Sequence, residues 1–454
     1  MSVAVPDKLL AFLAHRCERP GGRESVSPST MNPGFFTPTG VIRNSRLQDI
    51  VNDRVLGVGD LGKLRFALVD LTGEKLNKPE FAGHRDLEQG GVGSMAKLAC
   101  MYATYQLQFD LQHFLTIGPL PDEKRFFAGM REFWRFSQLP TREKKVTNIF
   151  PARPRIDLVS SIVGSLVRVD GRFIPVPRPF SSPDLEEMFT IENGVVRFKG
   201  SDQTNVDVAA PPRFGTVSQR ARDYQGQFAP DGNLTEARKL TFADRLFLMI
   251  DDSDNPCSHT CIENVSFLYI ISSIWQADIY RPERGGGLWE GNNQDPGKNK
   301  FAWKKPPVPQ GNPKADFVSG TPASIAALYT LMEQDRLVSK NACINMRNLT
   351  DRKKPGLPGG SFNRSFFQDG LKKAVIFPER IHAKIGIGDA RDDSALIARD
   401  VDPTPRAPVR VRTRIRYVAV GCDDAPGPKL LHDLIERLDT CIRENNGLMT
   451  KQDA

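Results

Sequence analysis

The sequence predicts an α+β protein, with an antiparallel sheet that is flanked by helices and joined to a helical lobe. Strand-like alternation of apolar residues occurs at 63–73, and again at 380–390 and 412–422. Helix-favouring segments occupy much of the chain between them. We therefore expect the two ends of the chain to build one sheet together, because a sheet needs an apolar partner layer and the middle supplies it. With 454 residues, 39% of them hydrophobic, the chain can bury a large core.

The charge pattern argues against several classes of partner. There are 62 Lys and Arg against 54 Asp and Glu, a formal net charge of +8, but the basic residues are spread along the chain without a like-charged block. We therefore expect no nucleic-acid partner. The longest apolar run, "FLYIISSIW" from Phe267, is too short to span a bilayer, so we expect no membrane partner either.

The N-terminal stretch and the cysteines bear on the compartment. The apolar segment after Lys8 is short and ends in His15, Arg16 and Cys17 without a small-residue cleavage site. The seven cysteines, an odd number in a long chain, are typical of reduced thiols. We expect a cytoplasmic protein; a periplasmic or secreted protein whose leader had been removed would show the same pattern.

Composition divides the chain into segments. Residues 18–45 are rich in Pro, Gly and Ser, and we assign 1–45 to an N-terminal arm. We assign 46–90 and 375–454 to the sheet lobe, and 91–374 to the helical lobe with an insertion at about 119–240. Within the insertion, "VRVDGRFIPV" predicts a hairpin, because Asp-Gly lies between alternating apolar residues.

Helices are predicted in five places. They are 94–114, a segment carrying Leu246, Met249 and Ile250 at helical spacing, an apolar segment from Thr260 onward, a segment with Thr321 as N-cap and Pro322 in the first turn, and an amphipathic segment at 427–445. The Gly-rich segment 281–300 is predicted to be a loop.

The stretch "GGVGSMAKLACMYATYQ" places a lysine in an apolar helix start. Positions i and i+3 share a helix face, so Ser94 and Lys97 are expected side by side. Burial and a second cation lower the pKa of a lysine, and a neutral lysine next to a hydroxyl can activate it as a nucleophile. The alternative is a solvated lysine that extends from the helix surface.

Two further motifs follow the S-x-x-K motif along the chain. "SDN" occurs at Ser253, Asp254 and Asn255, in the break between two apolar segments, and "KIG" occurs at Lys384, Ile385 and Gly386 in a strand-like run. S-x-x-K, S-D-N and a K-T-G-like triplet form the signature of class A β-lactamases and penicillin-binding proteins.

The sequence therefore resembles the penicillin-recognising serine hydrolase superfamily, which has the β-lactamase/DD-peptidase fold. The resemblance covers residues 64–117, 241–280 and 320–446. It implies that Ser94 is the nucleophile that becomes acylated and Lys97 its base. It also implies that Ser253 relays a proton to the leaving group, and that Asn255 binds both the substrate and the lysine.

The same resemblance implies the rest of the site. Lys384 supplies positive charge from the strand, Gly386 belongs to the substrate-binding edge, and the backbone N–H groups of Ser94 and Ile387 form the oxyanion hole. It implies a small-molecule ester, amide or lactam substrate, and neither a metal nor another cofactor.

Three features depart from the family pattern. The segment between Ser94 and Ser253 is longer than in a minimal class A enzyme, so we expect the insertion beside the helical lobe. Ile385 stands where the family has Thr or Ser, whose hydroxyl helps to hold a substrate carboxylate. Glu290 lies roughly where class A enzymes carry the glutamate that activates the deacylating water, but E-x-x-L-N is absent. We interpret it as a solvated loop residue.

Three other motifs give weaker evidence of function. "GVGDLG" at 57–62 precedes a strand and not a helix, which argues against a dinucleotide site. Cys257 and Cys261 in "CSHTCIE" are interpreted as core thiols. His382 is interpreted as a strand residue.

The sequence thus predicts a serine hydrolase that forms an acyl-enzyme on Ser94. The alternative is a penicillin-binding or sensing protein with the same fold that does not turn its ligand over.

Overall fold

The computed structural model describes most of the two predicted lobes and parts of the insertion. The described residues are 45–58, 61–117, 122–127, 146–147, 156–161, 164–169, 172–176, 183–200, 218–224, 234–266, 269–270, 273–274, 277, 279–281, 286–291, 318–352, 365–387, 391–423 and 429–453. The predicted N-terminal arm lies outside these residues, apart from its last position. None of the helices within the described ranges is long and apolar enough to span a bilayer.

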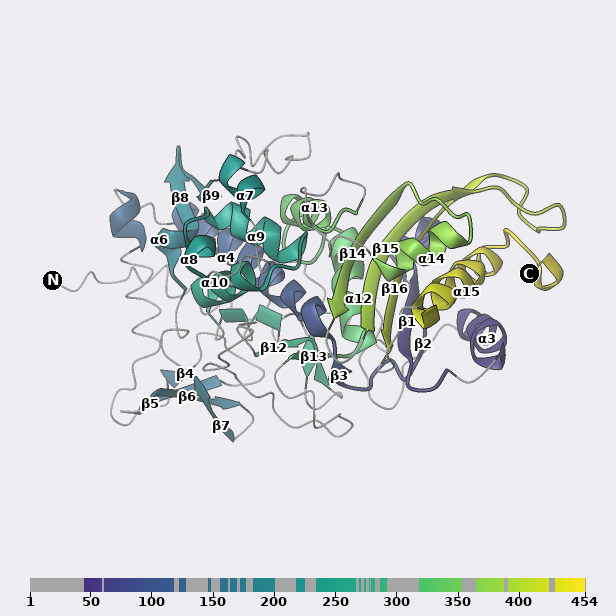
Figure 1. The fold of residues 1–454 in the computed structure, drawn as a ribbon, viewed down its shortest axis with the longest axis horizontal. Helices are drawn as coiled ribbons and strands as arrows, with labels where there is room; N and C mark the ends of the chain where they lie inside the picture. The colour runs from purple at the N-terminus through teal and green to yellow at the C-terminus, as the bar shows by residue number, and fades with distance from the viewer. Residues whose placement is uncertain are drawn as a thin grey trace.

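A five-stranded antiparallel sheet forms one half of the molecule (Figure 1). Its order is β14-β15-β16-β1-β2, and the strands are β1 (Arg65–Asp70), β2 (Glu80–His84), β14 (Arg380–Ile387), β15 (Arg391–Val401) and β16 (Thr413–Asp423). The first and the last strand in sequence pair in the middle, with Arg65 opposite Cys422. The prediction that both chain ends build one sheet is therefore confirmed. Strands β2 and β15 were not predicted.

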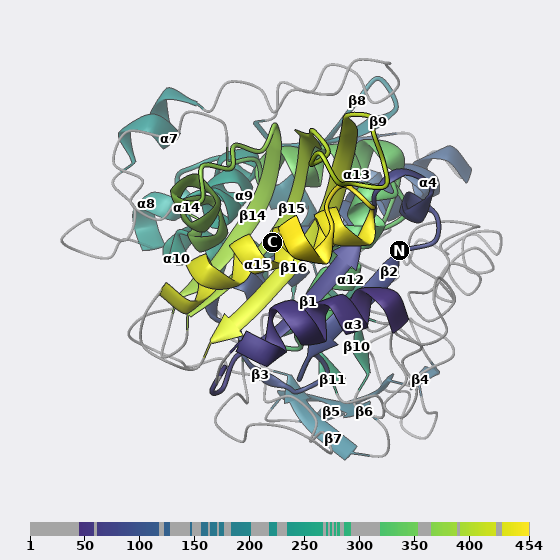
Figure 2. The same cartoon turned by 90° about the vertical axis from the view of Figure 1, so that its right-hand side faces the viewer.

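The sheet separates two apolar cores, because successive side chains of a strand point to opposite faces. Phe66 and Leu68 of β1 belong to one core, and Ala67 and Val69 to the other. The outer face is covered by α3 (Ser45–Arg54), α14 (Phe366–Lys373) and α15 (Lys429–Asn445), which lie in front of the strands in Figure 2. Helix α12 (Pro322–Glu333) contacts β1 and β16 from the inner face. Its predicted start is confirmed, with Thr321 and Ser324 forming a capping box.

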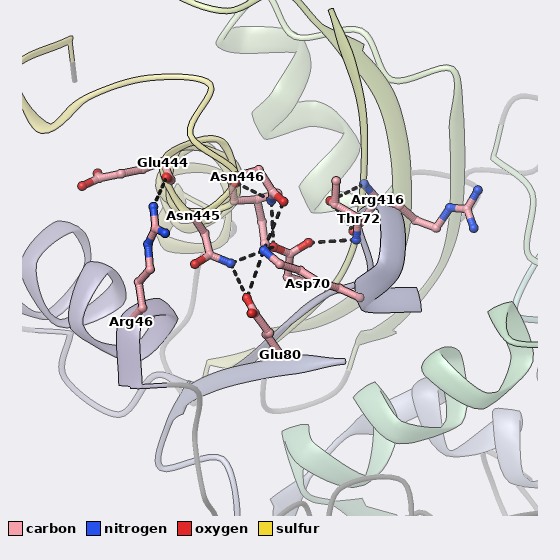
Figure 3. Close-up of polar contacts among 10 residues, drawn as sticks. Arg46, Asp70, Thr72, Glu80, Arg416, Glu444, Asn445 and Asn446 are labelled. Carbon is pink, nitrogen blue, oxygen red and sulfur yellow. Dashed lines mark hydrogen bonds and ion pairs between the residues drawn. The ribbon is translucent and has the colours of Figure 1, made fainter. Parts of the chain in front are cut away.

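A buried carboxylate ties the first strand to the last helix. Asp70 is fully buried and accepts hydrogen bonds from the Thr72 backbone N–H (2.9 Å), Lys75 Nζ (2.8 Å), Asn445 Nδ2 (2.8 Å) and Asn446 Nδ2 (2.7 Å). Figure 3 shows the two asparagines at the end of α15 pointing toward this carboxylate. Because four donors converge on two oxygens, the charge of Asp70 is well satisfied although it is buried.

The second half of the molecule is the helical lobe, on the left of Figure 1. Its helices are α4 (Lys97–Ile117), α6 (Leu185–Met188), α7 (Gln219–Asp223), α8 (Leu234–Arg238), α9 (Phe242–Ile250), α10 (Asn255–Val265) and α13 (Lys340–Leu349). They share the inner core with α12 and the inner sheet face. The predicted fold class, an antiparallel sheet flanked by helices with a helical lobe, is confirmed.

Two helix boundaries differ from the prediction. Helix α10 begins at Asn255 and not at Thr260, because the Asp254 side chain accepts the Cys257 N–H as N-cap and Pro256 fits the first turn. The helix predicted from Ser94 begins with a 3₁₀ turn, η3 (Gly93–Ala96), before α4 continues.

Short strands make up much of the rest. In the insertion β4 (Val146–Thr147), β5 (Ile156–Ser161), β6 (Gly164–Val169) and β7 (Arg172–Val176) form one sheet, and β8 (Phe189–Glu192) pairs with β9 (Val195–Phe198). Strands β6 and β7 pair from Val169 and Arg172 outward, which confirms the hairpin predicted at Asp-Gly.

The sequence predicted a loop at 281–300, but part of this segment forms strands. It contains β11 (Gly286–Gly287), which pairs with β10 (Tyr280–Arg281), and β12 (Trp289–Glu290). Strand β12 joins β13 (Val318–Gly320) and β3 (Gly90–Gly91) in a small sheet next to η3. Strand β12 is formed by pairing with a distant strand, which leaves no local pattern in the sequence.

Candidate active site

The predicted nucleophile lies where the chain turns from β3 into α4. Ser94 is half-buried in η3, and Lys97 follows as the first residue of α4. The Lys97 N–H bonds back to the Ser94 carbonyl, so the two residues are one turn apart as predicted. The N-terminal end of α4 thus lies directly behind the serine, where the helix dipole favours negative charge.

Lys97 is inside the protein and not on its surface. Its side chain is fully buried, which rules out the alternative of a solvated lysine. Its Nζ donates to the Ser253 carbonyl (2.6 Å) and to Asn255 Oδ1 (2.7 Å), and it lies 3.5 Å from Ser253 Oγ. The first two motifs, far apart in sequence, therefore meet at one amine.

Lys384 approaches the same serine from the sheet. It is fully buried in β14, and its Nζ lies 2.6 Å from Ser253 Oγ. Ser253 itself is in a left-handed conformation with φ +59°, which costs a residue other than glycine about 1–2 kcal/mol. This strained turn aims one hydroxyl at two lysines.

Burial decides the charge of both amines. It lowers the pKa of Lys97 to about 8, against the opposing attraction of the Asp254 and Glu290 carboxylates. Burial also lowers the pKa of Lys384 well below its usual range, and the positive charges of Lys97 and Arg352 lower it further. The cluster can therefore hold one amine in its neutral form near neutral pH.

Glycine allows β14 to contact η3 backbone to backbone. A Cβ on Gly386 would lie 2.1 Å from the Val92 carbonyl oxygen, and one on Gly93, whose φ is +47°, would lie 2.9 Å from the Ile387 nitrogen. Within β14 the carbonyls of Ile381 and Ala383 point away from β15, toward residues 350–352. By alternation the Ile387 N–H lies along that same edge, next to the serine turn.

Glu290 is the one site candidate whose interpretation has to be corrected. It is fully buried in β12, opposite Val318, and β12 contacts α4. Its carboxylate is close enough to Lys97 to raise the pKa of that amine. Gln89 fixes the neighbouring backbone, since its amide bonds to both the N–H and the carbonyl of Gly287. Glu290 is therefore not a solvated loop residue.

The remaining sequence candidates lie apart from this chemistry. Cys257 and Cys261 are buried in α10, and burial raises the pKa of both thiols, as expected of core residues. His382 lies in β14, and its Nδ1 is 2.7 Å from the Arg347 carbonyl oxygen. Ile385 alternates with Lys384 and so shares the face of Ala383, whose core includes α14 and α15.

Sequence reasoning missed Arg352. Its guanidinium donates to the carbonyl oxygens of Ile250, Asp251 and Ala383, which lie just before Ser253 and Lys384 in the chain. Because it binds backbone atoms, no motif or periodicity marks it. Gln89 escaped notice for the same reason.

Comparisons with known proteins add similarities of structure. No family model matches the chain, and no curated protein matches it. Among solved structures it is similar to a β-lactamase from Sphaerobacter thermophilus DSM 20745 at 12% identity, with 90% of this chain and 100% of that chain covered and a TM-score of 0.40. It is similar to a class A β-lactamase from Bacteroides cellulosilyticus DSM 14838 at 12% identity, with 89% and 99% covered and a TM-score of 0.40. It is also similar to a protein named PBP-A at 13% identity, with 88% and 97% covered and a TM-score of 0.39. At such identities and TM-scores, evidence about function has to come from the site itself.

Proposed function

We propose that this protein is a serine hydrolase that forms an acyl-enzyme on Ser94 from an ester, amide or lactam. The observation that carries the proposal is the convergence of Lys97, Ser253 and Lys384 in one buried hydrogen-bonded cluster beside Ser94. Two buried amines around one hydroxyl are costly to a fold, because each must be desolvated. Acyl transfer needs a base and a proton relay, which such a cluster can supply.

Lys97 is the proposed base. Its hydrogen bonds go to two acceptors, the Ser253 carbonyl and Asn255 Oδ1, so a neutral amine would use both of its hydrogens there. The lone pair is then available for the proton of Ser94, one turn away. Attack forms the bond between Ser94 Oγ and the acyl carbon while Lys97 becomes an ammonium.

Ser253 is the proposed relay. Its Oγ lies 3.5 Å from Lys97 Nζ and 2.6 Å from Lys384 Nζ, so it can pass a proton from Lys97 to the leaving group as the bond from acyl carbon to leaving group breaks. Lys384 stabilises the negative charge that develops on that oxygen. The N–H groups of Ser94 and Ile387, with Gly386 allowing the close approach, are the proposed oxyanion hole.

Glu290 is the proposed base for deacylation. A water gives a proton to Glu290 as it attacks the acyl carbon, the bond from that carbon to Ser94 Oγ breaks, and the Ser94 oxygen regains a proton from the base. Glu290 is a buried carboxylate within electrostatic range of Lys97. If this step fails, the acyl-enzyme persists, and the protein binds or senses acylating compounds without turnover.

The test is intact-mass spectrometry over time, with a penicillin and with a small activated ester. The proposal expects an adduct on the wild-type protein and none on Ser94→Ala, with unchanged thermal melting. An adduct that clears indicates a hydrolase, and the preferred reagent distinguishes lactamase from esterase. A lasting adduct indicates the binding or sensing protein. An adduct of equal yield on Ser94→Ala contradicts both.

A further inference from the structure

Arg352 connects the two backbone segments that carry Ser253 and Lys384. Its Nη1 lies 2.9 Å from the Asp251 carbonyl oxygen, and its Nη2 lies 3.3 Å from that of Ile250. Both carbonyls are at the C-terminal end of α9, where the helix leaves them without intrahelical partners. The guanidinium thus caps the helix that delivers the strained Ser253 turn.

The same guanidinium binds the strand that carries Lys384. Its Nε and Nη2 lie 2.9 Å and 2.7 Å from the Ala383 carbonyl oxygen, and the Arg352 N–H bonds to the Ile381 carbonyl. Ala383 directly precedes Lys384. One planar group therefore sets the distance between the helix end and the strand.

From this geometry we propose that Arg352 is a positioning residue for acyl transfer, which holds the Ser253 hydroxyl and the Lys384 amine in contact by binding the backbone ahead of each. The inference rests on the proposed function, since it assigns a role within that same site. A fixed fork of donors is needed, because three carbonyls in two elements must be bound at once. A lysine offers a flexible point charge instead.

The charge of Arg352 has a second effect. The side chain is 1% exposed, and its Nη1 lies 3.6 Å from Asp251 Oδ1, so its positive charge is held inside the protein next to a carboxylate. Lys384 is surrounded by Lys97 and Arg352, which lower its pKa, and by Asp251 and Asp393, which raise it. Asp252 also faces it, with a pKa that burial raises to about 6 against the opposing charge of Lys384. Removal of the guanidinium should therefore raise the pKa of Lys384.

The experiment measures the rate of Ser94 acylation per folded site as a function of pH, for wild type, Arg352→Gln, Arg352→Lys and a control. We expect Arg352→Gln to lower the rate at least tenfold. We also expect it to move the apparent pKa of the profile, which Lys97 sets, to lower pH, because a Lys384 that keeps its proton to higher pH repels the proton on Lys97. Arg352→Lys keeps the charge but not the fork, so we expect the lower rate with an unshifted profile.

Arg399→Gln is the matched control. Arg399 also makes a paired contact inside the fold, from Nε to Asp439 Oδ1 at 2.9 Å, but it lies between β15 and α15. Its loss should lower stability and leave the acylation profile unchanged. A wild-type rate and profile per folded site in Arg352→Gln would overturn the proposal, as would a wild-type rate in Arg352→Lys where Gln prevents folding. If wild type itself forms no adduct, the proposed function fails instead.

Discussion

The protein contains two buried clusters of charged groups, and each offsets the cost of burying those groups in a different way. Around Asp70, one carboxylate receives four donors, including the Lys75 ammonium. Around Ser253, two lysines share one hydroxyl in a strained turn, and burial lowers the pKa of both. The first arrangement holds its charge firmly, whereas the second lowers the cost of moving a proton. The contrast lies in the donors and acceptors: four donors share one carboxylate around Asp70, whereas two amines share one hydroxyl around Ser253.

The largest expected effect comes from removal of Lys97. Lys97→Met should lower the rate of Ser94 acylation by about 10²–10⁴, the usual contribution of general base catalysis. Quenched-flow mass spectrometry with the activated ester measures it. Circular dichroism serves as the control, because the loss of a buried amine must not be confused with unfolding. Acylation at the wild-type rate would show that Lys97 is structural, like Lys75.

Glu290 and Asp70 form a matched pair, since both are fully buried carboxylates. Glu290→Gln should slow clearance of the adduct about a hundredfold, because the proposed deacylating base is lost. Above pH 8, where Lys97 is already neutral, formation of the adduct should change little. The decay of the acyl-enzyme mass peak gives the rate. Clearance as fast as in wild type would remove Glu290 from the mechanism.

Asp70→Asn should lower stability and leave acylation unchanged. An amide offers one acceptor oxygen to donors that converge on two, so we expect the free energy of unfolding to fall by about 3 kcal/mol. Chemical denaturation measures it. Acylation per folded site should not change, and the exposed pair of Asp53 with Lys451 provides a control substitution, Asp53→Asn, that leaves stability unchanged. A large loss of acylation in Asp70→Asn would contradict the division between the clusters.

The dependence of acylation on pH tests the proposed base without a substitution. Only the neutral amine of Lys97 accepts a proton, and its pKa is about 8. The acylation rate should therefore fall about tenfold for each pH unit below 8 and level off above it. A stopped-flow series from pH 5.5 to about 9.5 tests this expectation with the ester. A rate that stays flat down to pH 6 would require another base.

The sequence predicted most of what local patterns can encode. The three motifs located Ser94, Lys97, Ser253 and Lys384, and the structure brings the last three into contact. Glu290 was misinterpreted because its burial results from pairing with Val318 across a small sheet. Interactions of that kind, between a residue and distant backbone, leave no period or spacing in the chain.

The prediction of strands was also limited to those with a clear local pattern. Alternation identified β14 and β16. Strand β15, "RDDSALIARDV", begins with three charged residues and has two more just before its last, so its buried centre has no clear alternation. The Asp70 cluster could not be foreseen either, because its partners at the end of α15 are 375 and 376 positions away.

The pairing of β1 with β16 also determines when the molecule can fold. A ribosome adds about 5–20 residues each second, so the 376 positions between Asp70 and Asn446 take on the order of tens of seconds to synthesise. During that time β1 and β2 have no central partner, and their apolar faces are exposed. Helices α9, α10 and α12 are completed first. The sheet can therefore close only after its last strands have been synthesised.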